Sequence, residues 1–285
     1  MRPDLRDAPL DAVVGLAATS VPTDADLERR FGGLRRLYGD TRYACIRAAH
    51  AVVVGVGGVG SWAAEALARS GVAALTLIDL DHVSESNVNR QVQALGSTVG
   101  QAKVDALRQR VADIHPGCEV VAIEEFVEPD NWPALLARVA RPVDVVIDAC
   151  DQGRAKAVLA AWALASGTPL VIVGAAGGKR KAEAVAVEDL GLVTHDPMLA
   201  SLRQRLRRHH GAGRGRLGLA CVYSREPVQA PLDVDACDVD GSLNCHGYGS
   251  SVAVTATFGM VAASAAIESL LAVRRPRKVT SETTL

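Results

Sequence analysis

From about residue 30 onward, short runs of β-branched and other apolar residues alternate with longer segments whose apolar positions recur at helical spacing. The short runs predict buried strands, and the longer segments predict helices. Continuous apolar strands separated by helices are typical of a parallel sheet that is covered on both faces. The predicted strands are residues 51–55, 74–79, 119–123, 143–148 and 169–173, and the predicted helices are residues 61–70, 99–114, 130–139 and 154–165.

The pattern changes after Gly174, where glycine-rich turns become frequent. This second part predicts an antiparallel strand at 183–188, an arginine-rich helix at 197–210 and loops at 211–218 and 233–248. The sequence therefore predicts an α/β fold with a Rossmann-like, doubly wound, mainly parallel sheet and helices on both faces. A C-terminal extension with antiparallel strands and helices follows.

The segment 247–267 contains no charged residue and is about as long as a bilayer is thick. It consists mainly of Ala, Ser, Thr, Gly and Val, and has few of the large apolar side chains that favour membrane insertion. We therefore expect a buried helix that packs on the sheet, and contact with a membrane is the less favoured alternative.

Composition narrows the class of protein without identifying it. The chain has 285 residues, of which 49% are hydrophobic and 22% charged, and this excludes a disordered, collagen-like or disulfide-stapled protein. Its 31 basic and 32 acidic side chains give a net charge of -1, so any contact with nucleic acid must come from a local patch. Its six cysteines are dispersed without a C-x-x-C pair, which predicts a cytoplasmic protein with no structural zinc.

The strongest local signal is the turn Gly55-Val-Gly57-Gly58-Val-Gly60, which lies between a predicted strand and a predicted helix. Its glycines let backbone N–H groups approach phosphate oxygens, and the helix directs its positive end toward them. Asp79 ends the next predicted strand, where a carboxylate accepts hydrogen bonds from ribose hydroxyls. The motif predicts an adenine nucleotide, but by itself it leaves open a nicotinamide or flavin enzyme and a turn without a ligand.

Charged residues beyond the strand ends distinguish these alternatives. Arg90 follows the second strand, Lys103 lies on the next helix, and Asp151 follows a later strand. Hydride transfer needs a flat nicotinamide pocket, whereas nucleotidyl transfer needs cations for the phosphates and a carboxylate for magnesium. Each charge alone is common on a solvated surface, but positions after successive strand ends predict one shared crevice.

Several motifs together resemble a known family. GVGGVG, IDLD, SNVNRQ, Lys103 and DACD are similar to the adenylating superfamily of ubiquitin-activating, MoeB-like and ThiF-like enzymes. Four further segments resemble its tRNA threonylcarbamoyladenosine dehydratase branch, and the resemblance extends from about Arg30 to Ala272. These segments are RFGGLRRLYG at 30–39, GSWAAEALARSGV at 60–72, FVEPDN at 126–131 and LNCHGYGSSVAVTATFGMVAA at 243–263.

On this basis the chain divides into three parts. We expect an N-terminal tail or arm at 1–29, a single ThiF/MoeB-like adenylating domain at 30–273 and a C-terminal tail at 274–285. Within the domain, residues 51–151 would hold the nucleotide site and residues from about 175 to 250 a substrate-facing extension.

The resemblance implies a role for each matching residue. The implied ATP-binding residues are Gly55, Gly57, Gly58, Gly60, Asp79, Asp81, Asn87, Asn89, Arg90, Gln91 and Lys103. The implied catalytic residues are Arg90, Lys103 and Asp151, with Asp151 as the Mg²⁺ ligand and Cys245 as a further candidate. The implied cofactors are ATP and Mg²⁺, with a monovalent cation, Na⁺ or K⁺, as a further one.

The N-terminal arm departs from the family pattern. In MoeB-like relatives an arginine of this arm reaches the ATP of the partner subunit. The matching segment here reads RFGG, with glycine near that position, so Arg30, Arg35 and Arg36 are candidates only.

The family implies a specific reaction. ATP adenylates the free carboxylate of the threonylcarbamoyl group on an adenosine beside the tRNA anticodon. The carbamoyl group of the modification then attacks the activated carbonyl, AMP leaves, and a ring forms with net loss of water. Cys245 has His246 beside it and is a candidate nucleophile, although intramolecular ring closure needs no enzyme thiol.

A local basic patch offers a surface for tRNA. From Pro197 to Arg225 there is no acidic residue, and arginine is frequent. Such a run neutralises phosphates and gives salt-dependent binding, although a solvated face without a ligand is the plainer alternative. The candidate tRNA-binding residues are Arg203, Arg205, Arg207, Arg208, Arg214 and Arg216, and Lys179, Arg180 and Lys181 extend the patch.

The family also implies partners, and several alternatives stay open. It implies a homodimer and a cysteine desulfurase with its sulfur-acceptor protein. The first alternative is an adenylating enzyme for a ubiquitin-like sulfur carrier, which the missing C-x-x-C pairs disfavour. The others are a nucleotide-binding scaffold without catalysis and a dinucleotide-dependent oxidoreductase.

Overall fold

A sheet of seven strands forms the centre of this computed structural model, which describes residues 24–139, 141–229 and 248–273. The strand order is β3-β2-β1-β4-β5-β7-β6, and every neighbouring pair is parallel except β7 and β6. The order reverses between β1 and β4. The strands are β1 (His50–Val54), β2 (Ala74–Ile78), β3 (Glu119–Ile123), β4 (Val145–Asp148), β5 (Leu170–Val173), β6 (Val185–Asp189) and β7 (Ala220–Ser224).

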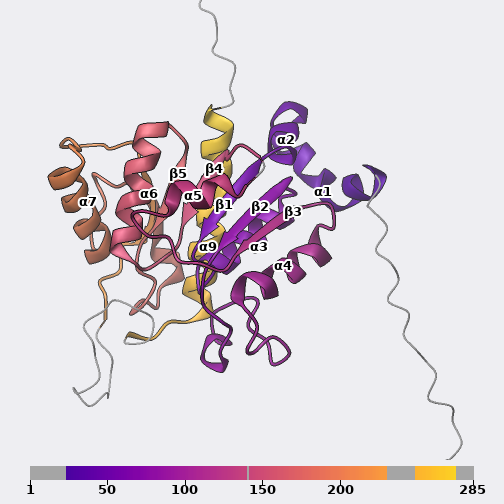
Figure 1. Cartoon of the computed structure of the whole chain (residues 1–285), viewed down its shortest axis with the longest axis horizontal. Helices are drawn as coiled ribbons and strands as arrows, with labels where there is room; N and C mark the ends of the chain where they lie inside the picture. Colours follow the sequence, from indigo (N-terminus) through magenta and orange to yellow (C-terminus); the bar gives the residue numbers. More distant parts are fainter. Residues whose placement is uncertain (1–23, 140, 230–247, 274–285) are drawn as a thin grey trace, which may run out of the picture.

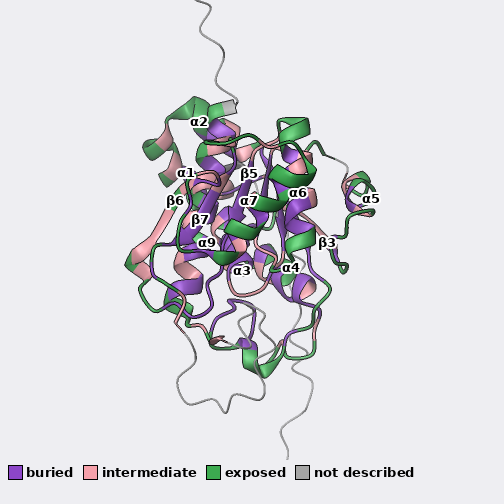
Figure 2. Ribbon diagram, turned by 90° about the vertical axis from the view of Figure 1, so that its left-hand side faces the viewer, coloured by how far each residue is buried: buried purple, intermediate pink, exposed green. Residues whose placement is uncertain are grey.

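Helices cover both faces of the sheet (Figure 1). One face packs against α3 (Gly60–Arg69), α4 (Lys103–Ile114) and α9 (Val252–Val273), and the other against α5 (Trp132–Ala137), α6 (Gly153–Ser166) and α7 (Pro197–His209). Figure 2 shows the central strands as buried, the edge strand β6 as partly exposed, and the helices with exposed outer surfaces. The predicted Rossmann-like α/β fold is confirmed.

The apolar pattern of β1 explains why both faces are covered. All five residues of β1 are buried. Ala51 and Val53 belong to the core beneath α3 and α9, whereas Val52 and Val54 belong to the core beneath α6. Alternate side chains of a strand point to opposite faces, so an uninterrupted apolar strand is stable only with helices on both sides.

Two helices that the apolar pattern does not predict, α1 (Asp24–Tyr38) and α2 (Asp40–Arg47), precede β1. α1 begins inside the segment expected as a tail at 1–29. Its buried Phe31 packs on His115 with 4.7 Å between the ring centroids. Arg30 Nη1 donates hydrogen bonds to the main-chain oxygens of Asp113 and Ile114, which are among the last carbonyls of α4. α1 is thus attached to the sheet through α4.

Other boundaries also differ from the prediction. β7 lies within the acid-free, arginine-rich stretch, and no strand is predicted there. It is buried between β5 and β6, so the expected antiparallel extension consists, among the described residues, of β6 against β7. The helix predicted from residue 99 begins at Lys103, because residues 99–102 form turns that end in a bridge between His82 and Ala102. The 3-10 helices η1 (Glu85–Asn87) and η2 (Ala182–Ala184) complete the elements described.

The uncharged C-terminal segment forms α9, which lies on β4, β5, β6 and β7 and against α3. Val252–Ala272 is long and apolar enough to cross a membrane by length and composition. However, 56% of its most apolar window is buried inside the molecule, and Phe258 and Ala262 are fully buried. Its packing is that of a core helix, as expected.

We predict that Gly259→Ala lowers the free energy of unfolding by about 1–3 kcal/mol, the usual cost of overpacking. A Cβ atom at Gly259 would lie 2.6 Å from both Trp62 Cβ and Val59 O, so α9 would have to move away from α3. Urea denaturation measures the change. Ser264→Ala, at an exposed position on the same helix, is the control and should stay within about 0.5 kcal/mol of the parent. If Gly259→Ala had the same free energy of unfolding as the parent chain, this close contact between α9 and α3 would be contradicted.

Candidate functional site

The glycine-rich turn follows β1 at the point where the strand order reverses. Open α/β sheets bind ligands in the crevice at such a reversal. Gly55 N donates to Ile78 O of β2 at 2.8 Å, and Ala149 N, just after β4, donates to Val54 O at 2.8 Å. Backbone hydrogen bonds therefore hold the start of the turn between the ends of the neighbouring strands β2 and β4.

The four glycines of this turn serve two purposes. A Cβ atom on Gly60 would lie 1.8 Å from Gly55 O, and Gly55 has a φ of +79°, so the turn closes only with glycine at both positions. Gly57 and Gly58 line a cavity instead, and the nearest atom to a Cβ on Gly57 is Gln91 Nε2 at 3.9 Å. Gly57 leaves room for an anion at the N-terminus of α3, whereas a Cβ on Gly58 would lie 3.2 Å from Thr255 Cγ2 of α9.

The cavity has a volume of about 480 Å³, which is within the usual range for a small-molecule site. On the β2 side it is lined by the glycine turn together with charged residues. On the β5 side its lining is largely uncharged and comes from the segment after β5 and from the start of α7. The charged residues are Asp79, Asp81, Arg90, Lys103, Glu125 and Asp151, and the uncharged ones include Val173–Gly177, Pro197, Met198, Ser201 and Leu202.

Asp79 connects the end of β2 to the glycine turn. Its Oδ2 accepts a hydrogen bond from Val56 N at 2.8 Å, and its Oδ1 accepts one from Asp81 N at 2.9 Å. Burial raises the pKa of this carboxyl group, and the nearby ammonium of Lys103 opposes that shift. Each oxygen keeps a further lone pair for a donor such as a ribose hydroxyl.

Arg90 and Lys103 reach the cavity from different elements. The main-chain oxygen of Arg90 accepts hydrogen bonds from Trp62 Nε1 of α3 at 3.0 Å and from Thr255 Oγ1 of α9 at 3.1 Å. Lys103 begins α4, and its Nζ lies 2.7 Å from Asp81 Oδ2. Both side chains are mostly buried yet line the cavity, so two cations face the space beside the glycine turn.

Asp151 lines the same cavity from the exposed loop between β4 and α6. Within the described ranges, no group of three or more His, Cys, Asp or Glu side chains is arranged to hold a metal ion. Mg²⁺, however, is commonly held by one or two carboxylates together with water and substrate phosphates. A carboxylate in a cavity that also contains a phosphate-type turn fits this mode of binding.

Some of the predicted ATP-binding residues do not line the cavity. Gln91 does, but Asn87 Oδ1 accepts a hydrogen bond from Ser84 N at 3.1 Å within η1, and Asn89 Nδ2 donates to Ser250 O at 3.0 Å. Asn87 therefore holds neighbouring backbone, and Asn89 also accepts a hydrogen bond from Arg90 Nη1 at 2.9 Å through its Oδ1. Cys245 lies outside the described residues.

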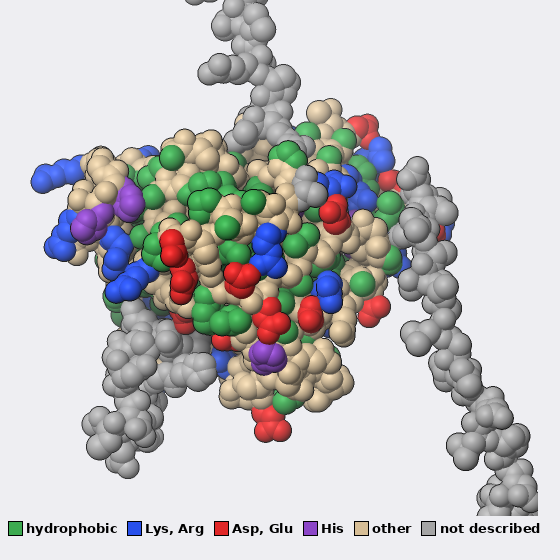
Figure 3. Space-filling view, in the orientation of Figure 1, with side chains coloured by type: hydrophobic (Ala, Val, Ile, Leu, Met, Phe, Trp, Pro, Cys, Tyr) green, Lys and Arg blue, Asp and Glu red, His purple; other side chains and the backbone are tan. Residues whose placement is uncertain are grey.

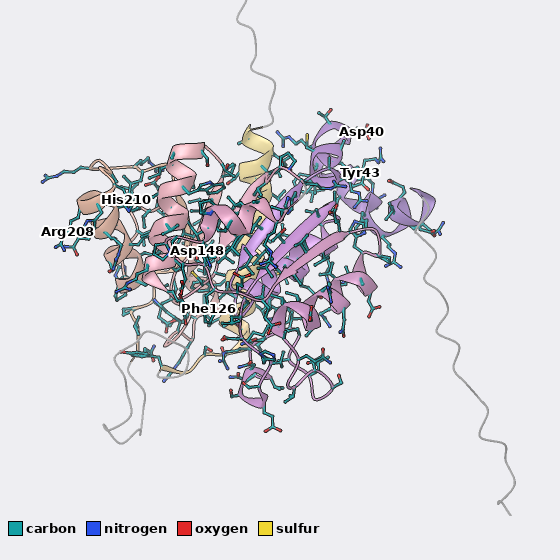
Figure 4. All side chains as sticks on the ribbon, in the orientation of Figure 1. Asp40, Tyr43, Phe126, Asp148, Arg208 and His210 are labelled. Carbon is teal, nitrogen blue, oxygen red and sulfur yellow. The ribbon has the colours of Figure 1, made fainter. Side chains whose placement is uncertain are left out.

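The cavity also has walls that the sequence reasoning does not assign. The loop after β3 contributes Glu125, Phe126 and Val127, and α9 contributes Thr255. Phe126 lies near the centre of Figure 4, among the side chains around the cavity. The FVEPDN motif marks this loop in the sequence. Thr255 lies within the family-like segment at 243–263, but nothing in that segment predicts its contact with Arg90, which is 165 residues away.

The candidate tRNA-binding arginines divide into exposed and internally bonded ones. Arg203 Nη1 donates to Leu190 O at 3.0 Å and to Val193 O at 2.9 Å, and Arg216 Nη2 lies 3.4 Å from Glu188 Oε1. Figure 3 shows basic side chains and histidines together over α7, and Figure 4 shows the labelled Arg208 and His210 at this outer end. Of the six candidates, Arg205, Arg207, Arg208 and Arg214 are exposed and form no ion pair with a described residue, and Arg207 Nε donates to Gly213 O at 3.3 Å.

Two of the three candidate arm arginines have partners within their own chain. Arg30 donates to the last carbonyls of α4, and Arg35 forms ion pairs with Glu28 and Asp40 at 3.0 and 2.8 Å. Arg36 is exposed on α1. Figure 4 shows Asp40 and Tyr43 near these helices, far from the labelled Asp148 at the end of β4.

Comparison with known proteins identifies the family. The model of the ThiF family matches residues 31–284. The chain belongs to the ThiF family. It is 42% identical over 259 residues to the tRNA threonylcarbamoyladenosine dehydratase of Escherichia coli K12, a match that covers 86% of this chain and 94% of that protein.

Two further comparisons locate the chain within the ThiF family. The structure of Escherichia coli tRNA N6-threonylcarbamoyladenosine dehydratase in complex with ATP is 40% identical, with a TM-score of 0.78, and the match covers 89% of this chain and 98% of that one. The Escherichia coli molybdopterin-synthase adenylyltransferase is 36% identical over only 120 residues, 42% of this chain and 47% of that protein. The resemblance to the dehydratase branch is thereby confirmed.

We predict that two glycine substitutions in the ThiF-family turn have different effects. Gly57→Val should leave stability within about 0.5 kcal/mol, because a Cβ there meets open space. It should weaken ATP binding about tenfold or more, because it obstructs main-chain hydrogen bonds to phosphate that are worth about 1–3 kcal/mol. Gly60→Ala should instead prevent stable folding. Calorimetric titration with ATP and thermal unfolding measure both effects, and unchanged ATP affinity in Gly57→Val would exclude this turn as the phosphate site.

Proposed function

We propose that this protein catalyses the ATP-dependent dehydration, by cyclisation, of N6-threonylcarbamoyladenosine next to the anticodon of tRNA. One observation carries the proposal. A single cavity brings together the glycine turn, Arg90, Lys103 and Asp151, and continues into a largely uncharged region beside α7. A site of this kind holds a nucleotide on one side and a carboxylate to be adenylated on the other. Extensive identity to named dehydratases supports the same substrate.

The chemistry follows from the charges in the cavity. The threonyl carboxylate attacks the α-phosphorus of ATP, and pyrophosphate leaves. Arg90 and Lys103 stabilise the negative charge that develops on the phosphates in this step. The carbamoyl group of the same modification then attacks the acyl carbon, and AMP leaves. Because both reacting groups belong to one side chain of the nucleoside, the enzyme has to hold them close together and exclude water.

Asp151 is the residue proposed to hold Mg²⁺ with the nucleotide. When bound there, Mg²⁺ would neutralise phosphate charge. A monovalent cation is part of the proposal without an assigned site. The main-chain oxygens of His195, Ser224 and Glu226 would suit such a cation, but the ammonium of Lys179 already donates hydrogen bonds to all three.

The start of α7 supports a path for tRNA from the cavity to the basic surface. Asp196 caps α7 by accepting from Leu199 N at 3.0 Å, and its second oxygen accepts from Ala175 N in the cavity wall at 2.9 Å. The 13-residue helix is about 20 Å long. A modified base in the cavity would therefore leave the stem phosphates within reach of Arg205 and Arg208 at its far end.

The proposal includes a cytoplasmic homodimer. Exposed apolar side chains on α9 and β6 support a second copy as the partner, because Val252, Met260 and Val187 are 45%, 42% and 47% exposed. A cysteine desulfurase with its sulfur-acceptor protein is a further proposed partner, and it rests on the family resemblance alone. The dispersed cysteines support the cytoplasmic location.

We expect purified protein with ATP and Mg²⁺ to release AMP and pyrophosphate only with tRNA that carries N6-threonylcarbamoyladenosine. The modified nucleoside should become lighter by one water in mass analysis. Unmodified tRNA and the Asp151→Ala variant are the controls, and both should give background release. If AMP release did not depend on tRNA but required a small protein ending in Gly-Gly, the protein would instead catalyse the adenylation of a sulfur carrier.

We predict that the triple variant Arg205→Gln, Arg207→Gln, Arg208→Gln raises the KM for tRNA and leaves that for ATP unchanged. Three fewer phosphate contacts should reduce the slope of log binding constant against log salt by up to about three. The variant Arg42→Gln, Arg108→Gln, Arg141→Gln loses the same charge at exposed positions on other elements and is the matched control. Equal tRNA binding by the two variants would make the α7 surface an ordinary solvated face.

A further inference from the structure

A buried ion pair lies below the cavity, where neither the turn nor the basic surface needs one. Lys156 of α6 and Asp148 at the end of β4 are both 0% exposed, and Lys156 Nζ lies 3.0 Å from Asp148 Oδ1. A buried ion pair is weak support for stability, because the cost of removing both charges from water is close to the attraction between them. We therefore look for a role of this ion pair in the elements that it connects, and not in the stability of the fold.

The ammonium of Lys156 joins the ends of two strands. It donates to the main-chain oxygen of Val173 at 2.8 Å and to that of Asp148 at 3.4 Å. β4 and β5 therefore share this cation at their carboxyl ends, where Val173 and Ala149 line the cavity. The main-chain N–H of Lys156 donates to Gln152 O at 3.0 Å. Lys156 thus contacts both ends of the loop that connects β4 to α6.

Asp148 fixes the middle of the same loop. Its Oδ1 accepts hydrogen bonds from Cys150 N at 3.3 Å and from Cys150 Sγ at 3.0 Å, in addition to that from Lys156. Its Oδ2 is buried and has no hydrogen-bond partner among the described residues. Two of the three donors to Oδ1 belong to Cys150, so the carboxylate of Asp148 holds the loop at this residue. Cys150 is the residue immediately before Asp151.

Asp151 itself is exposed, and no hydrogen bond from its side chain is found in the described part of the chain. Its position depends on its neighbours Cys150 and Gln152. Asp148 holds Cys150 through its side chain, and Lys156 holds the Asp148 carboxylate through its ammonium. Gln152 is held by the first backbone hydrogen bond of α6, which does not depend on the Lys156 side chain.

We propose that Lys156 and Asp148 are positioning residues, which hold the loop so that the Asp151 carboxylate faces the Mg²⁺-bound phosphates of ATP. The inference rests on the proposed function through its adenylation step. It assigns the pair no contact with substrate. Groups that orient a metal ligand from behind typically change metal affinity or activity by about 10- to 100-fold when they are replaced.

The test compares the double variant Asp148→Asn, Lys156→Met with the parent chain. Removing both charges together avoids leaving one of them buried and unpaired. Calorimetric titrations use ATP with Mg²⁺ and ATP with EDTA. We expect affinity for ATP with EDTA to stay near the parental value, because the glycine turn, Asp79 and Arg90 are unchanged. The gain in affinity that Mg²⁺ gives should fall by about tenfold or more, and kcat for AMP formation should fall with it while the KM for tRNA stays constant.

Leu159→Ala is the matched control for lost stability. Leu159 lies on the same helix and is fully buried, and its truncation is expected to destabilise the fold by about 2–5 kcal/mol. It should keep the full gain in affinity from Mg²⁺. An equal loss in Leu159→Ala, or a full gain in the double variant, would overturn the positioning role. If the double variant does not fold, a second double variant, Asp148→Asn, Lys156→Gln, which also leaves no single charge buried, takes its place under the same criteria.

The binding measurement also separates this inference from the proposed function. A parent chain that binds ATP more tightly with Mg²⁺ but forms no AMP with modified tRNA would refute the dehydratase proposal, and the variants would still decide the role of the pair. A parent chain that gains nothing from Mg²⁺ would refute the positioning role, whatever its activity.

Discussion

The close approach of Gly60 to the carbonyl oxygen of Gly55 is the constraint on which the rest of the molecule depends. It lets the turn of residues 55–59 close tightly between β1 and α3, with no space for a side chain at Gly60 against the oxygen of Gly55. Because α3 begins there, its N-terminus points at the crevice where the strand order reverses, and its far side meets α9 at Gly259. One backbone contact therefore sets both the anion-binding end of the site and the packing of one face of the sheet.

The part of the fold that the sequence predicts is the part governed by local patterns. β1 and β2 are short, buried throughout, apolar except for His50 and Thr76, and followed by glycine or aspartate, so their existence and burial follow from residues within the same segment. β7 follows from no such pattern, since it is short and its place between β5 and β6 depends on distant partners. α1 is also missed, because it is held by Phe31 on His115 and by Arg30 on the end of α4, which are contacts across more than 80 residues.

The same division applies to the site. The glycine turn, Asp79, Arg90, Lys103 and Asp151 all stand near predicted strand ends, and the topology of a parallel sheet brings such positions together. Asn87 and Asn89 belong to the same motif, yet they do not line the cavity: Asn87 holds nearby backbone, and Asn89 holds Ser250 O and the guanidinium of Arg90. Thr255 and Lys156 show the opposite case. Lys156 lies in no motif, and the family-like segment that contains Thr255 assigns it no role. Each is given its place by packing between elements that the sequence alone does not pair.

The contribution of α9 has a consequence for how this protein is made. Thr255 holds the backbone of Arg90, and α9 covers β4 to β7, yet α9 comes after every described strand in the chain. During translation the sheet can assemble while one of its faces is still bare, and domains generally begin to fold before synthesis ends. A nascent chain that stops before residue 252 would carry the glycine turn without the helix that holds Arg90 beside it. Ribosome-bound intermediates should therefore depend on chaperones to shield this face until the last helix emerges.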